Sequence, residues 1–248
     1  MKFYDKNGIM FDSGSNEKEK EKFIEKFLEQ YEPPYFVGQA PVKSVSGRVI
    51  GQNSCLAEKE MQTYLEKGII HSEDIIKILD WKIGRIDHKA SHIEGVVQYK
   101  DIPFDHFIVR SMYGREIKVE KLCNYIVSEY SSLSNRSPEE IYCSLLNLDV
   151  SGLGTVYLLT LVYFISKGKS PIYDQFAHRA LDALEKGLKP KAQEVPKHTV
   201  PEKKSKNAFK WFEDNYAKRL NGMFGSHYKE RKLDRALWVY GHLFKASD

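Results

Sequence analysis

Residues Ser151 to Asp174 read SGLGTVYLLTLVYFISKGKSPIYD. Two glycines, Gly152 and Gly154, flank a leucine and precede a nearly unbroken apolar run, and one aspartate, Asp174, ends the stretch. Glycine tolerates a positive φ and lets another backbone approach closely. A helix that is apolar on every side is typical of a buried position in a core. The stretch therefore predicts a tight turn, a central buried helix and an aspartate that could cap the next helix.

The residues around this stretch complete a set of three helices. Upstream, SPEEIYCSLLNLD places Ser137 at an N-cap, Pro138 at the first helical position and Glu140 at the third position of a capping box. This first helix is expected to end near Leu148. The second is expected from Thr155 to Lys167 with Gly168 as its C-terminal stop, and the third from Asp174 to Lys186, so residues 137–186 form one segment.

Most of the remaining chain also has helical periodicity, which predicts a mainly all-α fold. Asn7-Gly8 lies between two short apolar stretches and indicates a small N-terminal β-hairpin. Residues 187–206 contain three prolines and many lysines and are expected to be a loop or linker. Residues 95–115 are left unassigned. The other expected helices are 17–31, 56–67 with Gly68 as its stop, 72–81 capped by Ser72, 116–130, 207–220 and 230–245.

Length and composition limit the class of protein. A chain of 248 residues can form one large domain or two small ones. No apolar run reaches about 18 residues, so no transmembrane helix is expected, and the N-terminus lacks the apolar stretch of a secretory signal. Cys55, Cys123 and Cys143 form no CxxC pair, which argues against a zinc site and a disulfide framework. A monomeric cytoplasmic protein without a resident metal or cofactor is expected.

Charge is unevenly distributed along the chain. Residues 186–248 contain 15 Lys or Arg and 7 Asp or Glu, which gives +8, whereas the first 185 residues carry −4. A basic segment favours an anionic partner, with nucleic acid first. A solvated lysine-rich surface explains the same charges, and the charge distribution alone leaves the two interpretations equal.

The two glycines suggest a function for the turn. A short turn before a helix brings successive backbone N–H groups together at the positive end of the helix dipole, which suits a phosphate oxygen. Val150 and Leu153 could hold the turn on the core. The residues expected to contact a DNA backbone are Ser151, Gly152, Leu153, Gly154, Thr155 and Val156. A plain αα-hairpin with glycines for tightness is the alternative.

The stretch resembles the helix-hairpin-helix DNA glycosylases, the superfamily that contains endonuclease III and 8-oxoguanine glycosylase. Residues Val150 to Gly154 match the family's LPGVG hairpin, and Val156 takes the place of the lysine that follows it. Asp174 lies 18 residues after Val156, where the family has an aspartate before a helix, and Arg179 follows five positions later. The segments WKIGRID (Trp81 to Asp87) and RALWVYGH make the chain similar to a prokaryotic branch related to 8-oxoguanine glycosylase.

The resemblance implies a fold, a partner and a reaction. The fold would be one glycosylase-like unit over 1–248, made of two helical lobes with double-stranded DNA in the cleft between them. Asp174 would stabilise the positive charge that develops on the sugar when the bond to a flipped-out base breaks. Valine cannot form a Schiff base, so Val156 implies hydrolysis to an abasic site without strand cleavage. The excised base could be oxidised, which implies DNA repair, or virally modified, which implies antiviral defence.

Two rival functions remain open at this point. The chain could be a helix-hairpin-helix protein that binds DNA without catalysis. It could also be a bifunctional glycosylase and lyase that uses a displaced lysine, Lys82 or Lys169. The four-cysteine iron–sulfur loop of the endonuclease III branch is missing, since no cysteine follows Cys143. A monovalent cation at the hairpin is the one ion that the resemblance allows.

Weaker candidates complete the predicted site. Gln52 and Asn53 could fill the space left by a flipped base, although a surface loop explains them better. Trp81, Trp238 and Tyr240 could stack on a base, and core packing is the alternative for each. His178 could orient a water or a phosphate, or it could be a packing histidine. Phosphate contacts are also considered for the basic side chains Lys203, Lys204, Lys206, Lys210, Arg231, Lys232 and Arg235, each of which could equally be solvated.

Overall fold

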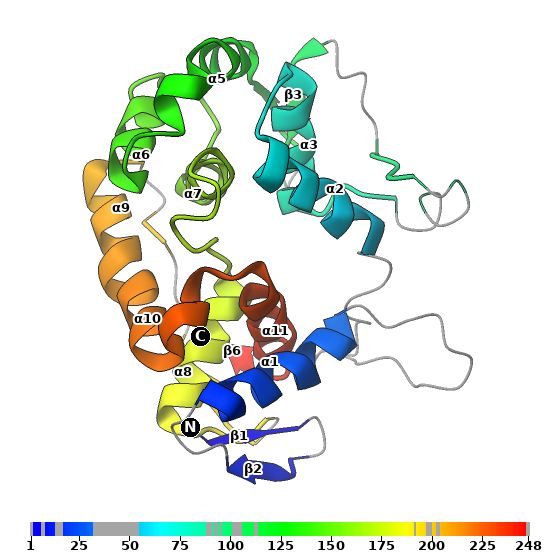
Figure 1. Ribbon diagram of the computed structural model, residues 1–248, viewed down its shortest axis with the longest axis vertical. Helices are drawn as coiled ribbons and strands as arrows, with labels where there is room; N and C mark the ends of the chain where they lie inside the picture. The colour runs from blue at the N-terminus through cyan, green and yellow to red at the C-terminus, as the bar shows by residue number, and fades with distance from the viewer. Residues whose placement is uncertain are drawn as a thin grey trace. The chain divides into compact units, whose positions relative to one another are not determined.

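The computed structural model describes most of the chain, in two compact units that are treated separately (Figure 1). One unit comprises residues 1–54, 173–199 and 213–248, and the other comprises residues 55–172 and 200–212. The first is called the terminal unit and the second the central unit. The described residues are 2–5, 8–12, 17–31, 55–87, 91, 94, 96–100, 106–111, 114–190, 192–196, 200–201 and 204–246.

The central unit is built around one apolar helix. Helix α7 contacts α2, α3, α6 and α9, and its residues from Leu158 to Ile165 are all buried. It therefore occupies the position that its uniformly apolar sequence predicts. The elements of this unit are α2 (Cys55–Lys67), α3 (Ser72–Ile83), β3 (Ile108–Arg110), β4 (Glu116–Lys118), α5 (Glu120–Leu133), α6 (Pro138–Leu146), α7 (Thr155–Ile165) and α9 (Lys206–Phe212).

The terminal unit joins the two ends of the chain. Helix α11 lies beside both α1 and α8 (Figure 1), and an aromatic core of Phe23, Phe27 and Tyr240 fills the contact between α1 and α11. Its elements are β1 (Lys2–Tyr4), β2 (Met10–Asp12), α1 (Glu17–Tyr31), α8 (Gln175–Lys186), β5 (Glu194–Val195), the π-helical turn η2 (Glu213–Ala217), α10 (Lys218–Phe224), the 3₁₀ turn η3 (Gly225–Lys229), α11 (Arg231–Gly241) and β6 (Lys245–Ala246).

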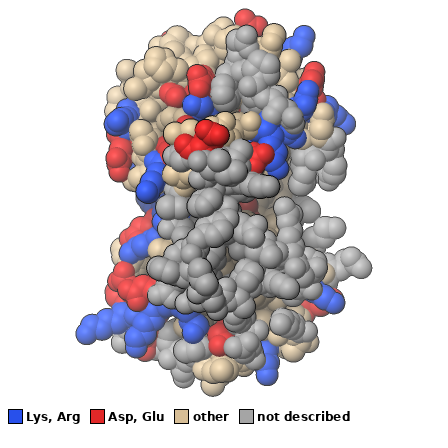
Figure 2. Space-filling model, turned by 90° about the vertical axis from the view of Figure 1, so that its right-hand side faces the viewer, with Lys and Arg blue, Asp and Glu red and all other residues tan. Residues whose placement is uncertain are grey.

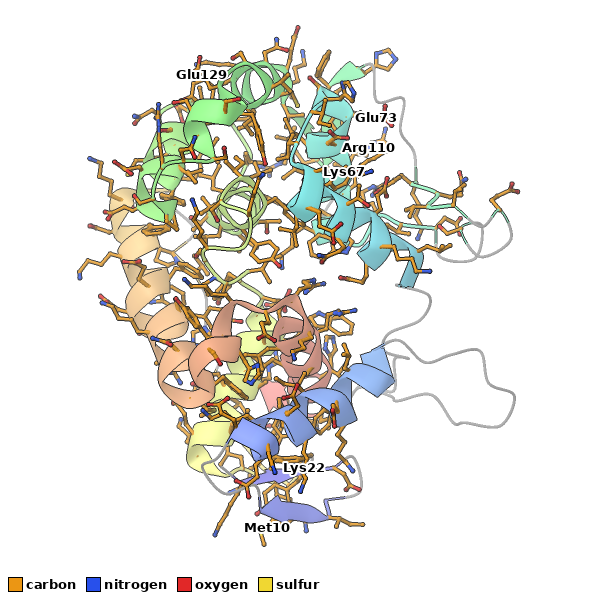
Figure 3. All side chains as sticks on the ribbon, viewed as in Figure 1. Met10, Lys22, Lys67, Glu73, Arg110 and Glu129 are labelled. Carbon is orange, nitrogen blue, oxygen red and sulfur yellow. The ribbon has the colours of Figure 1, made fainter. Side chains whose placement is uncertain are left out.

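The described residues are mainly helical, which confirms the all-α class predicted from periodicity. The strands form three short pairs: β1 with β2 and β3 with β4 are antiparallel, and β5 with β6 is parallel. The N-terminal hairpin is therefore confirmed, and Met10 is an exposed residue on it (Figure 3). In the described part of the chain, no helix is both long and apolar enough to cross a membrane.

One expected helix begins later than its periodicity suggests. Residues 116–118, assigned to a helix from 116 to 130, form strand β4, and α5 begins at Glu120. Gly114, with φ +78°, sits in the turn that pairs β4 with β3. Ile117 is buried between two exposed neighbours, which is the alternation of a strand. A local turn and tertiary pairing thus override the helical tendency of this stretch.

Smaller differences occur at the ends of elements. The N-cap of α3 is His71, whereas the sequence predicts Ser72 in this role. The carboxylate of Asp74 accepts hydrogen bonds from the N–H groups of Ile70 and His71, both at 2.8 Å. After α7, Lys167 takes the left-handed conformation, with φ +53°, one residue before Gly168. The predicted loop 187–206 contains β5, and the helix expected at 207–220 continues through a π-helical turn to Phe224.

Candidate functional site

The first part of the candidate site is the turn between α6 and α7, which is called the glycine turn (residues 147–154). Helix α6 begins with the capping box that the sequence predicts. Ser137 Oγ accepts from the N–H of Glu140 at 3.3 Å, and the Glu140 carboxylate accepts from the N–H of Ser137 at 2.8 Å. The Ser137 hydroxyl, which donates to the same carboxylate at 2.7 Å, and then the Ser137 N–H lower the pKa of Glu140. Local hydrogen bonds between residues three positions apart thus define the start of α6.

The two glycines of the turn have different roles. Gly152 has φ +82°, and a Cβ atom there would lie 3.2 Å from Cγ1 of Ile117. Gly154 is extended, with φ −82° and ψ 172°, and a Cβ there would meet only Tyr157, at 4.0 Å. Of the two glycines, only Gly152 therefore uses the positive φ that glycine allows. Asp149, with φ +47°, is the other left-handed residue of the turn.

The glycine turn presents its backbone and hides its apolar side chains. Val150 and Leu153 are buried, whereas Ser151 and Gly152 are exposed. Tyr157 and Leu158 both donate their N–H groups to the carbonyl of Gly154. Among the residues that the structure describes, no acceptor contacts the N–H groups of Gly152, Gly154, Thr155 or Val156. Open amides at a helix N-terminus can bind an anion.

Lys204 contacts this turn, and Pro201 contacts the start of α7. Lys204 Nζ donates to the carbonyl oxygen of Val150 at 2.6 Å and lies 3.6 Å from Oδ1 of Asp149. The Thr155 hydroxyl donates to the carbonyl of Pro201 at 3.0 Å, and Thr155 is buried. The Thr155 hydroxyl therefore already has a partner within the protein. Val156 is half-buried, beside the open amides.

The second part of the candidate site is Asp174, in the terminal unit. Asp174 is the N-cap of α8, as predicted, and its Oδ1 accepts from the N–H of Phe176 at 2.8 Å. The residue is half-buried. Its charge reaches its neighbours: burial chiefly, and the charge of Asp174 next, raises the pKa of Tyr216 well above its usual value. Burial lowers the pKa of Arg179, and the Asp174 carboxylate opposes that shift.

A buried polar network lies one turn further along α8. His178 is fully buried, with Nδ1 3.3 Å from the Tyr173 hydroxyl and Nε2 3.0 Å from NH1 of Arg219. The Arg219 guanidinium also binds Asp182 and Glu185, the latter at 2.6 Å. His178 therefore has partners on both ring nitrogens, which supports its interpretation as a packing histidine over a role in orienting a water or a phosphate.

An aromatic stack adjoins Asp174. The Phe176 ring stacks on His242, with centroids 3.6 Å apart, and lies 6.2 Å from Trp238. Trp238 is 4.1 Å from His242. Trp238 is thus half-buried in the same unit as Asp174 and linked to it through Phe176. The sequence does not predict the roles of Phe176 and His242, because their contact joins residues 66 positions apart.

The other aromatic and polar candidates are placed as follows. Tyr240 is fully buried, and its hydroxyl accepts from the N–H of Tyr4 at 3.3 Å, so it belongs to the core. Trp81 is half-buried in the central unit and packs edge-on against Phe164 at 5.9 Å. Gln52 and Asn53 lie outside the described residues. The glycine turn and Trp81 belong to the central unit, and Asp174 and Trp238 belong to the terminal unit.

Several of the predicted basic residues have acidic partners. Lys232 lies 3.0 Å from Glu21 and 3.2 Å from Glu230, and Arg231 is paired with Asp234. Lys206 and Lys210 are exposed on α9, Arg235 is half-buried, and Lys203 lies outside the described residues. On the face in Figure 2, acidic and basic side chains of the described residues are intermixed. The described Lys and Arg residues therefore do not form one continuous basic patch on that face.

A buried acid outside the predicted site was also missed. Asp80 on α3 is fully buried, and its two carboxylate oxygens accept no hydrogen bond from the described residues. Burial raises the pKa of Asp80 to about 7, and the charge of Arg85 opposes this shift. Nearby, Glu60 accepts from the hydroxyls of Tyr99 at 2.5 Å and Tyr64 at 3.1 Å. Asp80 directly follows the apolar residues Ile78 and Leu79, and this sequence context could have indicated its burial.

Comparison of the chain with protein-family models, with curated proteins and with solved structures gives no match.

Proposed function

We propose that the protein is a monofunctional DNA glycosylase of the helix-hairpin-helix type, with the two-lobed fold of that superfamily. The observation that carries the proposal is the half-buried N-cap carboxylate of Asp174, at the spacing from the glycine turn that the glycosylases share. The open amides of Gly154, Thr155 and Val156 add a site for one phosphate of double-stranded DNA. The proposed protein acts as a cytoplasmic monomer and needs no resident metal.

The proposed reaction breaks the bond between a sugar and a flipped-out base. Positive charge grows on the sugar as this bond lengthens, and the Asp174 carboxylate stabilises that charge. The N–H of Phe176 binds one oxygen of Asp174. In the proposed complex the carboxylate faces the sugar or the attacking water. Water then completes the hydrolysis and leaves an abasic site on an intact strand.

Two rivals keep specific support. A protein that binds DNA without catalysis is favoured by the cap bond of Asp174, because N-capping alone explains an aspartate at the start of a helix. A displaced lysine is the second rival. Lys169 is exposed and donates to the carbonyl of Ser134 at 3.0 Å, and Lys82 is half-buried at the end of α3.

A panel of duplexes with oxidised, alkylated and virally modified bases tests the proposal. The wild-type protein should release one class of base, and the class identifies a role in DNA repair or in antiviral defence. Asp174→Asn keeps the size and capping ability of the residue and removes its charge. This variant should bind DNA as the wild type does and lose excision by about 10²–10³-fold or more.

Asp214→Asn is the matched control, because Asp214 pairs with Lys218 at the surface of the same unit. It should excise at the wild-type rate. Equal excision by wild type and Asp174→Asn would show that another group stabilises the sugar. DNA binding without release of any base from the panel would favour the non-catalytic rival.

A further inference from the structure

A backbone amide of α8 binds one oxygen of the Asp174 carboxylate. Asp174 has an extended backbone, with φ −141° and ψ 139°, and the chain enters α8 at the next residue. The N–H of Phe176 donates to Oδ1 of Asp174 at 2.8 Å. Because this bond restrains the rotamer of the carboxylate, a shift of the Phe176 amide would also shift the two carboxylate oxygens.

The Phe176 ring packs against two side chains. His242 stacks on one face, with 3.6 Å between centroids and 20° between planes. The guanidinium of Arg179 lies 5.0 Å from the centroid of the same ring. These two side chains are themselves anchored to backbone carbonyls: Nδ1 of His242 lies 2.8 Å from the oxygen of Trp238, and NH1 of Arg179 donates to Phe244 at 2.9 Å.

The backbone of Phe176 is confined as well. A Cβ atom built on Gly241 would lie 1.8 Å from the carbonyl oxygen of Phe176 and 2.6 Å from its carbonyl carbon. Only a glycine at position 241 lets the first turn of α8 approach α11 this closely. The C-terminal end of α11 and the residues after it therefore hold Phe176 by its ring and by its main chain.

We propose that Phe176, Gly241 and His242 form a clamp that positions the Asp174 carboxylate. They are positioning residues, because they act on the reaction through Asp174. The catalytic consequence rests on the proposed glycosylase function, whereas the effect on the carboxylate does not. A misplacement of about 1 Å in a reacting group can reduce a rate by about 10²-fold, so a small shift of the Phe176 amide would be measurable.

Two substitutions of His242 separate stacking from hydrogen bonding. His242→Gln keeps a donor for the carbonyl of Trp238 and removes the ring, whereas His242→Phe keeps a ring for Phe176 and removes the donor. Excision at saturating protein should fall by about 10- to 100-fold in His242→Gln, with DNA affinity unchanged within about twofold, and His242→Phe should recover most of the rate. Loss of rate and affinity in parallel, or failure of His242→Phe to recover the rate, would contradict the clamp.

A second measurement requires no activity. In protein labelled with ¹⁵N-phenylalanine, hydrogen exchange at the Phe176 amide reports how firmly its bond to the Asp174 carboxylate is held. The wild type and His242→Phe should show slow exchange at this amide. His242→Gln should show faster exchange. If it does not fold, Phe176→Leu replaces it, and the amide of residue 176 is read in uniformly ¹⁵N-labelled protein. Equal exchange in all variants would overturn the clamp. A wild type that releases no base but loses the amide signature in His242→Gln would instead refute only the glycosylase function.

Discussion

The side-chain ammonium of Lys204 lies 2.6 Å from the carbonyl oxygen of Val150, so a residue 54 positions further along the chain closes the glycine turn. The same ammonium is 3.6 Å from the Asp149 carboxylate. An ammonium group has three N–H donors, and the turn offers it these two oxygens. Its positive charge therefore lies at the glycine turn, which is the proposed site of phosphate contact.

The first prediction concerns this contact. Lys204→Met should reduce affinity for duplex DNA to a similar degree for unrelated sequences, because a phosphate contact carries no base identity. The slope of log affinity against log salt should fall by about 1. Lys204→Met should also lower the free energy of unfolding by about 1–2 kcal/mol through loss of the bond to Val150.

Lys206→Met is the matched control, since Lys206 is exposed two residues away. Its unfolding free energy should stay within about 0.5 kcal/mol of the wild type. Fluorescence anisotropy over a salt series and urea denaturation measure both effects. Equal behaviour of the two variants would mean that Lys204 has no special relation to the turn.

The second prediction separates the two glycines. Gly152→Ala should lower the unfolding free energy by about 1–2 kcal/mol, because Gly152 has φ +82° and a Cβ there would approach Ile117. Gly154→Ala should be close to neutral for folding, because its backbone is extended and the space around it is open.

DNA binding should respond differently at the two positions. Gly154→Val should retain the fold and weaken binding, because its side chain would crowd the amides at the start of α7. Gly154→Ala is the smaller control. Urea denaturation and affinity for two unrelated duplexes measure these effects, and full affinity in Gly154→Val would exclude this face of the turn from the DNA contact.

The third prediction is a pH dependence that arises at Asp80. The folded-state pKa of Asp80 is about 7, raised by burial, whereas an aspartate in the unfolded chain has a pKa of about 3.9. Between these values the folded protein binds a proton that the unfolded chain has released. The free energy of unfolding should therefore fall as pH rises from about 4 to about 7, and the loss should be complete above pH 7.

Asp80→Asn removes this titration and should be more stable than the wild type at pH 8, by up to about 4 kcal/mol, since each pKa unit corresponds to about 1.4 kcal/mol. The difference should shrink toward pH 4.5. Glu129 lies on the exposed side of α5 in the same unit (Figure 3), and Glu129→Gln is the control. The difference in unfolding free energy between this variant and the wild type should not grow from pH 4.5 to pH 8. Urea denaturation at pH 4.5, 6 and 8 tests this, and a parallel pH profile for wild type and Asp80→Asn would show that Asp80 is ionised when folded.

Local signals in the sequence predicted much of the fold. The capping box at Ser137, the apolar run of α7 and the Asp174 cap each depend on residues within one or two helical turns, and the structure contains all three. The strand at 116–118 could not be predicted in this way, because its pairing with β3 depends on contacts across the turn at Gly114.

The same distinction applies to the candidate site. The positions of Asp174 and the glycine turn follow from spacing along the chain. The bond from Lys204 to Val150 and the stack of Phe176 on His242 join residues separated by 54 and 66 positions, and nothing in the local sequence indicates them. The bond from the Thr155 hydroxyl to the carbonyl of Pro201 likewise joins residues that are 46 positions apart. Contacts of this kind are set by tertiary packing, to which periodicity and capping patterns are insensitive.

The last prediction concerns Val156, which stands where the bifunctional glycosylases have a lysine. Valine has no nucleophile, so no imine with the sugar can form at this position. Release of the base should leave the phosphodiester chain intact until hot alkali cleaves the abasic site, and borohydride should trap no protein–DNA adduct during turnover.

Lys169 and Lys82 are the alternative nucleophiles. Lys169 donates a hydrogen bond to the carbonyl of Ser134 at 3.0 Å, and this bond would have to break before Lys169 could attack the sugar. Trapping that disappears in Lys169→Ala or Lys82→Ala would identify the substitute and replace hydrolysis with imine chemistry. Trapping that survives both changes would equally refute hydrolysis by water alone.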